Sequence, residues 1–186
     1  MSLFDRVKKI ITQPKAEWQT IAAEETTTQS LYTGYVIPLA AIGPIASIIG
    51  FSMIGFGYFR LPIGSAITHA LVTYVLTLVG VYVVALIIDA LAPNFSGEKD
   101  MAQALKVSAY ASTASWLGGI FLLIPAISVI GTLAGLYSLY LFYLGLPVLM
   151  KAPHEKALAY SIVVIIVAVI IFVIVGMVTR MVVAFP

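Results

Sequence analysis

The sequence predicts an all-α membrane protein, a bundle of five transmembrane helices with a cytoplasmic N-terminus and an amphipathic interfacial helix before the first span. Of its 186 residues 61% are hydrophobic and only 10% are charged, whereas a soluble domain carries about 25% charged residues. The mean hydropathy is +1.07. Four long tracts carry no charge at all, and they lie between Glu25 and Arg60, Arg60 and Asp89, Lys106 and Lys151, and Lys156 and Arg180. The residues outside these tracts are too few for a soluble catalytic or nucleotide-binding domain.

The length of each tract sets the number of spans. A spanning helix needs about 20 apolar residues, so the tract between Lys106 and Lys151 must cross the membrane twice and the other three once each. We expect spans at residues 32–56, 66–90, 102–124, 127–150 and 158–179. The chain then divides into a cytoplasmic amphipathic segment, 1–30, and a five-span domain, 31–186. Long apolar tracts favour helices over the short alternating strands of an outer-membrane barrel.

The positions of the basic residues predict the orientation, because Lys and Arg are enriched in short cytoplasmic loops. With the N-terminus inside, eight of the 10 basic residues are cytoplasmic, and Arg60 and Arg180 remain outside. We therefore expect a multi-pass protein of the inner (cytoplasmic) membrane. An odd number of spans places its C-terminus in the periplasm or outside the cell.

The N-terminal segment has the pattern of an amphipathic helix. One helical face collects the apolar residues Leu3, Phe4, Val7, Ile10 and Ile11, and the charged residues lie opposite. Pro14 begins a second short stretch, in which Trp18 and Ile21 form a smaller apolar face. Two interpretations are open: an anchor that lies in the layer of anionic lipid headgroups, or a docking face for a cytoplasmic partner.

Two ionisable residues lie near the cytoplasmic ends of neighbouring spans. Asp89 ends the second span, and Lys106 lies about one turn inside the third. Ionisable groups within the membrane are costly and mark candidate functional sites. Asp89 and Lys106 could form a structural ion pair that pins this hairpin, form a pair that handles protons or ions, or make no contact.

The third span carries a polar stripe. Gln103, Lys106, Tyr110 and Thr113 follow one another at spacings of three, four and three residues, among many small side chains. Such a helix belongs inside the bundle rather than against lipid. The candidate polar cluster or cavity comprises Asp89, Lys106, Tyr110, Thr113, Tyr137 and Tyr140. It would either line a wet cavity or donate hydrogen bonds to neighbouring helices.

Other residues are assigned to helix packing. Gly131 and Gly135 form a small-xxx-small pair in the fourth span, which suits close contact between helices, and Gly145 and Pro147 follow on the same span. The fifth span is almost entirely Ile, Val and Ala between residues 162 and 175. We expect it to be the span most exposed to lipid.

The sequence contains no pattern that supports catalysis. It has no cysteine, phosphate-binding loop, nucleophile elbow or pair of catalytic carboxylates. His69 and His154 lie at different depths of the predicted bundle, so they cannot share a metal ion. The net charge of +2 is too small to indicate nucleic acid binding. We therefore expect no enzyme activity, no catalytic residues, no metal, no cofactor and no nucleic acid partner.

Three stretches together resemble the Yip family of integral membrane proteins. They are residues 89–97, which include Pro93, Phe95 and Gly97, residues 104–111 with Trp116 after them, and residues 136–151. Pro14 followed by Trp18 and Ile21 is similar to the bacterial branch. The resemblance covers almost the whole chain, and it implies a cytoplasmic N-terminus and five spans.

The resemblance also implies a class of function. Eukaryotic members look like trafficking and membrane-organising proteins with a long cytoplasmic region for partners, including small GTPases. The N-terminal segment here is short, so the GTPase-binding role is not carried over. We expect a non-enzymatic membrane-organising or protein-interaction scaffold. Its expected partners are the lipid bilayer, a second copy of the chain, and a membrane or cytoplasmic protein. The alternative is a small transporter or channel for an ion or small solute, with a cytoplasm-facing polar cavity between spans two, three and four.

Overall fold

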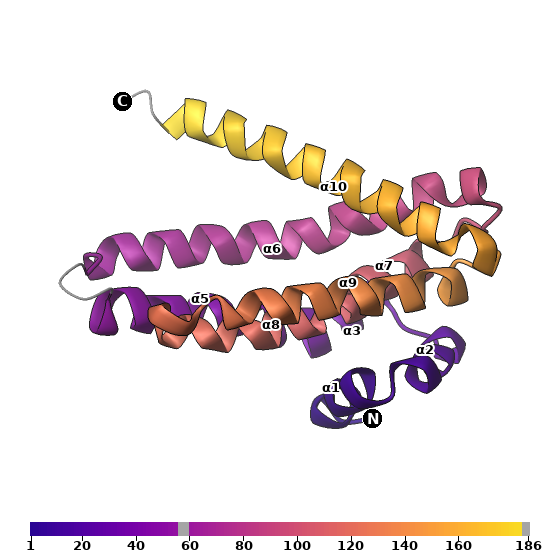
Figure 1. Cartoon of the computed structure of the whole chain (residues 1–186), viewed down its shortest axis with the longest axis horizontal. Helices are drawn as coiled ribbons and strands as arrows, with labels where there is room; N and C mark the ends of the chain where they lie inside the picture. The colour runs from indigo at the N-terminus through magenta and orange to yellow at the C-terminus, as the bar shows by residue number, and fades with distance from the viewer. Residues whose placement is uncertain (56–59, 184–186) are drawn as a thin grey trace.

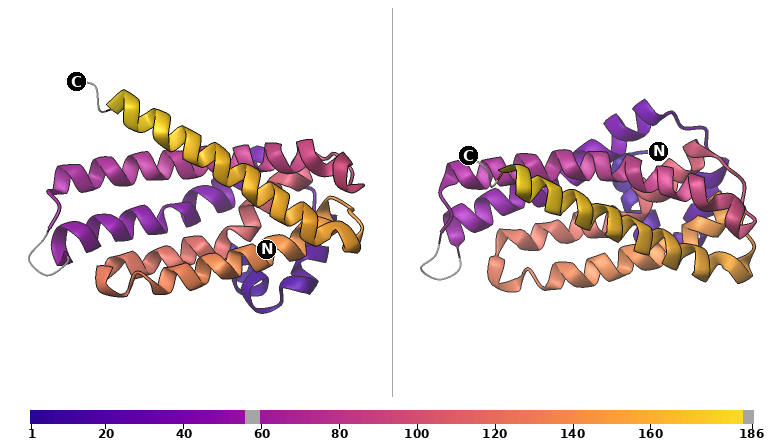
Figure 2. Two further views of the ribbon diagram at one scale, coloured as in Figure 1. Left: turned by 45° about the horizontal axis from the view of Figure 1, so that its top comes forward. Right: turned by 90° about the horizontal axis from the view of Figure 1, so that it is seen from above.

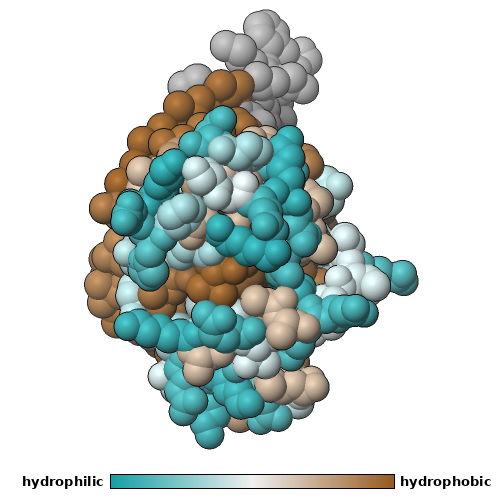
Figure 3. Space-filling view, turned by 90° about the vertical axis from the view of Figure 1, so that its right-hand side faces the viewer, coloured by the Kyte–Doolittle hydropathy of each residue, from teal (hydrophilic) through white to brown (hydrophobic). Residues whose placement is uncertain are grey.

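The computed structural model describes residues 1–55 and 60–183, with side chains placed to Ile174, and in these ranges every regular element is a helix. Two short helices, α1 (Leu3–Thr12) and α2 (Pro14–Ala23), lie beside one end of a bundle formed by the rest of the chain (Figure 1). We call the end that carries α1 and α2 the proximal end and the opposite one the distal end. Hydrophilic side chains gather on the proximal end, and hydrophobic surface lies along the flank behind it (Figure 3).

Four helical stretches of the described residues are long and apolar enough to cross a membrane. They are Thr28–Ile54, Ile63–Phe95, Ile130–Leu149 and His154–Ile174. Their positions agree with the predicted first, second, fourth and fifth spans. An all-helical membrane fold is therefore supported, whereas the count of five spans and the orientation are not confirmed.

The predicted third span, 102–124, is not one continuous helix. It consists of α7 (Met101–Ala111), α8 (Thr113–Gly118) and the 3₁₀ helix η4 (Gly119–Leu123). At the break, the hydroxyls of Ser112 and Thr113 donate hydrogen bonds to the carbonyls of Ser108 and Tyr110. Such side-chain bonds compete with the helical pattern and bend helices. α7 itself is buried from Ala104 to Ala111, as the polar stripe predicts for a helix inside the bundle.

The first long stretch is also irregular. It comprises α3 (Thr28–Leu31), η1 (Tyr32–Val36), α4 (Ile37–Ala40), α5 (Ile42–Ile49) and η2 (Gly50–Ile54). Pro38 and Pro44 have no N–H to donate, so the regular pattern is interrupted near both. The carbonyl of Ile37 instead accepts a hydrogen bond of 3.0 Å from the Tyr74 hydroxyl. This side chain comes from α6 (Ile63–Leu91) and joins the first two stretches.

Small residues bring α8 against α9 (Ile130–Leu149). A Cβ on Gly118 would lie 2.5 Å from the Cβ of Ala134, and a Cβ on Gly131 would lie 3.0 Å from the Gly118 carbonyl oxygen. Gly135 faces Ser115 across the same contact. The small-xxx-small pair of the fourth span thus serves packing within the chain.

Among its described side chains, the last helix, α10 (His154–Val183), is most deeply buried in its first half. It buries Ala157, Tyr160, Val164 and Ala168, whereas its described side chains beyond Ala168 are half-buried or exposed. Figures 1 and 2 show α10 diverging from α6 and α9 toward the distal end. The prediction that this span is the one most exposed to lipid is not confirmed, because its buried share of 28% equals that of the first two long stretches.

Gly50 provides a first test of the packing. A Cβ on Gly50 would lie 1.8 Å from the Leu122 carbonyl oxygen, whereas a Cβ on Gly34 would meet nothing within 4 Å. We expect Gly50→Ala to destabilise the protein by about 1–3 kcal/mol or more, because backbone must move. The matched variant Gly34→Ala, also within a π-helical segment, should be neutral or stabilising by up to about 1 kcal/mol. Thermal unfolding in detergent measures both, and equal midpoints would contradict the packing described here.

Candidate functional site

The apolar faces of α1 and α2 pack against the rest of the chain. Ile10, Trp18 and Ile21 are at most 1% exposed, and α1 contacts α8 while α2 contacts α9. Leu3 and Phe4 remain exposed, so the apolar face predicted for this segment is divided between protein and surroundings. This packing within the chain is an arrangement that neither interpretation of the sequence included.

Side chains of α7 cap the C-terminal end of α2. Gln103 donates a hydrogen bond of 3.0 Å to the Ala22 carbonyl, and the Lys106 ammonium donates to the carbonyls of Ile21 and Glu24. The last carbonyls of a helix have no partner within it and carry partial negative charge, which favours a cation. Two of the four stripe residues, Gln103 and Lys106, therefore cap the C-terminal end of α2.

A tyrosine of α9 does the same for α1. The Tyr137 hydroxyl donates a hydrogen bond of 2.7 Å to the carbonyl of Ile11, near the end of α1. The ring of Tyr140 lies 5.6 Å from that of Tyr137 and is largely exposed. At the C-terminal end of each N-terminal helix, a carbonyl thus accepts a hydrogen bond from a side chain of the bundle.

Arg6 lies at the centre of the contact between the two N-terminal helices. It is 6% exposed, and its guanidinium pairs with the carboxylates of Glu17 and Glu24 while standing 5.6 Å from the centre of the Tyr110 ring. Burial lowers the pKa of Arg6, but the hydrogen bond that Arg6 donates to Glu24 and the surrounding charges outweigh it, so the pKa is raised overall. Arg6 therefore stays charged at any physiological pH, since its charge is lost only above that raised pKa.

Trp18 fills a recess on α9. A Cβ on Gly145 would lie 2.5 Å from Cε2 of the Trp18 indole, so only glycine permits this approach. The indole also meets the Tyr110 ring edge-on, with ring centres 6.4 Å apart. We name the set of Gln103, Lys106, Tyr110, Tyr137 and Gly145 the N-terminal clamp.

Thr113 lies just beyond the clamp and is fully buried. Its hydroxyl donates to the Tyr110 carbonyl at 2.6 Å and lies 2.7 Å from the Tyr35 hydroxyl. Since the proton of Thr113 is already used, Tyr35 is the donor to it. The Tyr35 ring in turn contacts Tyr110 edge-on at 4.6 Å.

Asp89 lies apart from these residues, on the α6 side facing α10. No salt bridge joins Asp89 to Lys106 in the part of the chain that the structure describes. Its Oδ1 atom is buried and has no hydrogen-bond partner among the described residues. Of the three alternatives for this pair, the structure has the one without contact, because the Lys106 ammonium donates to carbonyls of α2. Of the six predicted cluster residues, Lys106, Tyr110 and Tyr137 contact the N-terminal helices. Thr113 and Tyr140 lie beside Tyr110 and Tyr137, and Asp89 lies apart.

The family-motif loop closes the proximal turn after α6. Pro93 and Phe95 belong to the 3₁₀ helix η3 (Ala92–Phe95), and Phe95 stacks on the Tyr160 ring at 4.8 Å. The Gly97 amide donates to the Ala92 carbonyl at 2.9 Å, and a Cβ on Gly97 would lie 2.9 Å from the Met150 carbonyl oxygen. This loop therefore joins the ends of α6, α9 and α10 by close backbone contact. Pro147 is buried within α9 nearby.

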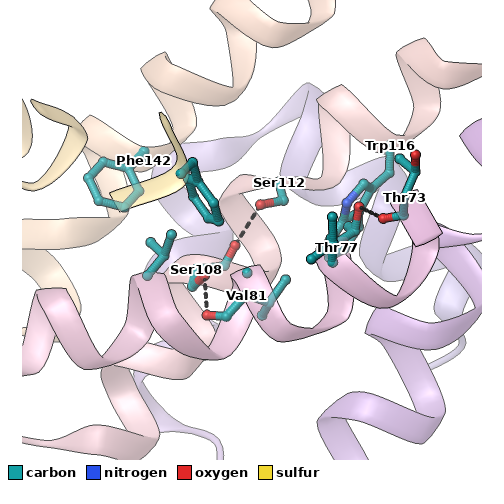
Figure 4. A pocket seen from close by; sticks show the side chains of 11 residues that line it. Thr73, Thr77, Val81, Ser108, Ser112, Trp116 and Phe142 are labelled. Atoms are coloured by element: carbon teal, nitrogen blue, oxygen red, sulfur yellow. Dashed lines mark hydrogen bonds between the residues drawn. The ribbon is translucent and has the colours of Figure 1, made fainter. Parts of the chain in front are cut away.

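A cavity does lie between α6, α7, α9 and α10, but further toward the distal end. Its volume is about 410 Å³, and its labelled lining in Figure 4 includes Thr73, Thr77, Ser108, Ser112 and Trp116. None of the six predicted cluster residues is among its described lining. The described residues also contain no group of three or more His, Cys, Asp or Glu side chains that could hold a metal ion.

Arg6, Glu17 and Glu24 were not among the site residues predicted from the sequence. One signal was present: Glu17 and Glu24 are seven residues apart, which places both near the helical face that carries Trp18 and Ile21. Acidic residues on the apolar face of a short helix indicate a buried partner. The partner, Arg6, lies on the preceding helix and is found only from the tertiary structure.

These features define a class of protein: an all-helical membrane protein whose N-terminal helices are clamped to the outside of its bundle. Residues 8–176 match the family model described as the Yip1 domain, and the chain belongs to the Yip1 domain family. The chain is 29% identical over 160 residues to "Inner membrane protein YohC" of Escherichia coli strain K12, with 82% of each chain covered. The protein of the same name from E. coli O6:H1 shows the same identity and coverage. No solved structure matches the chain.

Proposed function

We propose that this protein is a non-enzymatic scaffold that organises the inner membrane or its proteins, with its N-terminus in the cytoplasm. The name of the E. coli relatives supports the location, and the bias of basic residues supports the orientation. One observation carries the functional proposal: polar side chains of α7 and α9 donate hydrogen bonds to α1 and α2 and so hold these helices in place. A scaffold needs a surface of fixed geometry, and the N-terminal clamp provides one.

The surface so fixed is basic. Lys8, Lys9 and Lys15 are exposed on α1 and α2, and no salt bridge within the described residues involves them. Basic side chains near a membrane attract anionic headgroups and acidic protein surfaces. We propose that partners reach the protein at this face, and that copies of the chain associate laterally.

Crosslinking in cells and native mass spectrometry in phospholipid nanodiscs test the scaffold proposal. We expect crosslinks from position 9 to a second copy or to a partner protein, and their loss in Arg6→Met, which releases the clamped helices. Lys151→Met is the matched control, because Lys151 is an exposed cation outside the clamp. The proposal would be overturned if the protein is a monomer and deletion of its gene changes neither the membrane morphology nor the association of neighbouring proteins.

The transporter alternative is supported by the cavity of about 410 Å³. It would not use the predicted polar cluster, because Lys106 and Tyr110 are only 3% and 6% exposed. Flux of ions or small solutes from reconstituted vesicles separates the two functions. We expect no flux above that of empty vesicles. Flux that depends on a cavity residue such as Thr77 would favour transport.

Lys106 gives a direct test of the clamp. Lys106→Met leaves the carbonyls of Ile21 and Glu24 without their donor, which costs about 1–3 kcal/mol for buried acceptors. We expect hydrogen exchange of the α2 amides to accelerate accordingly. Asp89→Asn should leave exchange in α2 unchanged, since Asp89 lies apart from the clamp. Equal exchange in wild type and Lys106→Met would show that the capping bonds do not hold α2.

A further inference from the structure

The divergence of α10 leaves a lateral groove beneath it. The cavity of about 410 Å³ lies between α6 and α10, and a second of about 250 Å³ lies between α9 and α10. The two share Val84, Ser112, Phe142 and Phe172, so they adjoin each other beneath α10. We call the two adjoining cavities the lateral groove. Figure 1 shows that the helices around it separate toward the distal end.

Three of the hydroxyls that line the groove are already bonded to backbone carbonyls. The hydroxyls of Thr77, Ser108 and Ser112 donate to the carbonyls of Thr73, Val81 and Ser108, respectively, each at 2.8 Å. Figure 4 shows these three bonds along the wall. The remaining lining is mainly aliphatic and aromatic. The hydroxyls of Thr73 and Ser115 and the indole N–H of Trp116 make no hydrogen bond among the described residues. A polar solute would therefore find few free groups here, whereas an apolar occupant suits the greater part of the lining.

The volume selects a thin occupant. A helix about 10 Å across and ten residues long occupies roughly 1,200 Å³, which is far more than the larger cavity of about 410 Å³. A single alkyl chain fits. A methylene group takes about 30 Å³, similar to the volume of one water molecule in the liquid, so the cavity of about 410 Å³ holds about a dozen of them. A helix from a second copy is thus too thick.

The surroundings supply such a chain. The outward side chains of α6 and α10 beside the groove are exposed and apolar; they include Val75, Val79, Ile166 and Ile170. Both helices are long and apolar enough to cross a membrane, so the groove opens toward lipid. Gly80 keeps it clear, because a Cβ there would lie 3.1 Å from the Phe172 ring.

We propose that the lateral groove binds one acyl chain of a bilayer phospholipid, which enters sideways between α6 and α10. The occupant fills space that α10 leaves open and links this helix to the bundle. This site is separate from the N-terminal clamp and from the scaffold proposal.

Photolabelling tests the proposal. The full chain is reconstituted in vesicles of phosphatidylethanolamine and phosphatidylglycerol that contain a trace of phosphatidylcholine with a diazirine in its acyl chain. Peptide mass spectrometry compares labels on the groove residues Val84 and Phe142 with labels on the outward residues Leu71 and Val75. We expect groove labelling in the wild type, and a fall of about tenfold or more relative to the outward residues when the groove is filled.

Gly80→Leu and Ser112→Phe fill the groove from two helices, and Val79→Leu is the matched control on the outward face of α6. We expect the ratio of groove to outward labels to fall in both filled variants and to stay at the wild-type value in the control. An unlabelled groove in the wild type would overturn the proposal. So would a crosslink between two copies through the groove, or oxidation of Trp116 by a water-soluble radical probe, because either shows a different occupant.

Discussion

Arg6→Met is expected to release α1 and α2 from the bundle. The substitution places an unbranched apolar side chain at position 6 and removes the guanidinium charge. Glu17, which is 4% exposed, then loses its only salt-bridge partner among the described residues. Removing one member of a buried pair costs about 3–5 kcal/mol, because the other charge stays buried and uncompensated. Trp18 then moves from a dry site to water or lipid headgroups. Its fluorescence emission, measured in a Trp116→Phe background so that one indole reports, should shift to longer wavelength.

The control for this experiment is Lys9→Met. It removes the same charge from the same helix, but Lys9 is exposed, so little change is expected. The triple variant Arg6→Met, Glu17→Gln, Glu24→Gln should recover part of the docking, since it removes the uncompensated carboxylates. The network is not what holds the segment if Arg6→Met and Lys9→Met give the same Trp18 emission and the same protease resistance.

Gly145→Ala is expected to expel Trp18 from its recess on α9. The new Cβ would lie 2.5 Å from the indole Cε2 and 2.6 Å from Cζ2, and a buried, rigid ring cannot yield as a flexible chain can. Overpacking of this kind costs about 1–3 kcal/mol. Helix propensity acts in the opposite direction, because Ala is favoured over Gly in a helix by about 1 kcal/mol. We expect the clash to prevail, with faster hydrogen exchange in α2 and a red-shifted Trp18 emission.

Gly135→Ala serves as the matched control on the same helix. A Cβ on Gly135 would meet only the Ser115 hydroxyl, at 3.9 Å, so propensity alone should operate and α2 should be unaffected. Trp18→Leu combined with Gly145→Ala should restore docking relative to Gly145→Ala alone. The resulting double-mutant cycle isolates the contact between the two positions. Additive effects would show that Trp18 and Gly145 do not interact.

Much of the helical organisation followed from tract length and charge. The positions of four long helices agree with spans predicted from charge-free tracts, because the thickness of the hydrocarbon layer imposes a minimum apolar length. The third predicted span was not continuous, since its Ser and Thr hydroxyls bond to backbone within the helix. Periodicity detects which face is polar, but it does not detect this competition for carbonyls.

The polarity of the candidate site and its place inside the bundle were predicted from the sequence, but the groups to which its side chains bond were not. An ion pair with Asp89 across a short loop was one alternative for Lys106. Lys106 instead caps α2 by donating to the carbonyl of Glu24, which is 82 residues away in the sequence. The sequence shows which groups need partners, and several groups can satisfy the same need. Only the packing of α2 on α9 brings one set of carbonyls close enough.

Apolar length, charge position and helical periodicity therefore sufficed to establish a helical membrane protein and to predict its orientation, because each depends on local composition and on the bilayer as a solvent. The folding back of α1 and α2, the pairing of Arg6 and the lateral groove depend on contacts between residues far apart in the chain. Such contacts are selected by shape, as the recess at Gly145 and the clearance at Gly80 illustrate. Shape complementarity of this kind leaves no periodic trace in the sequence, so it becomes visible only once the helices are packed.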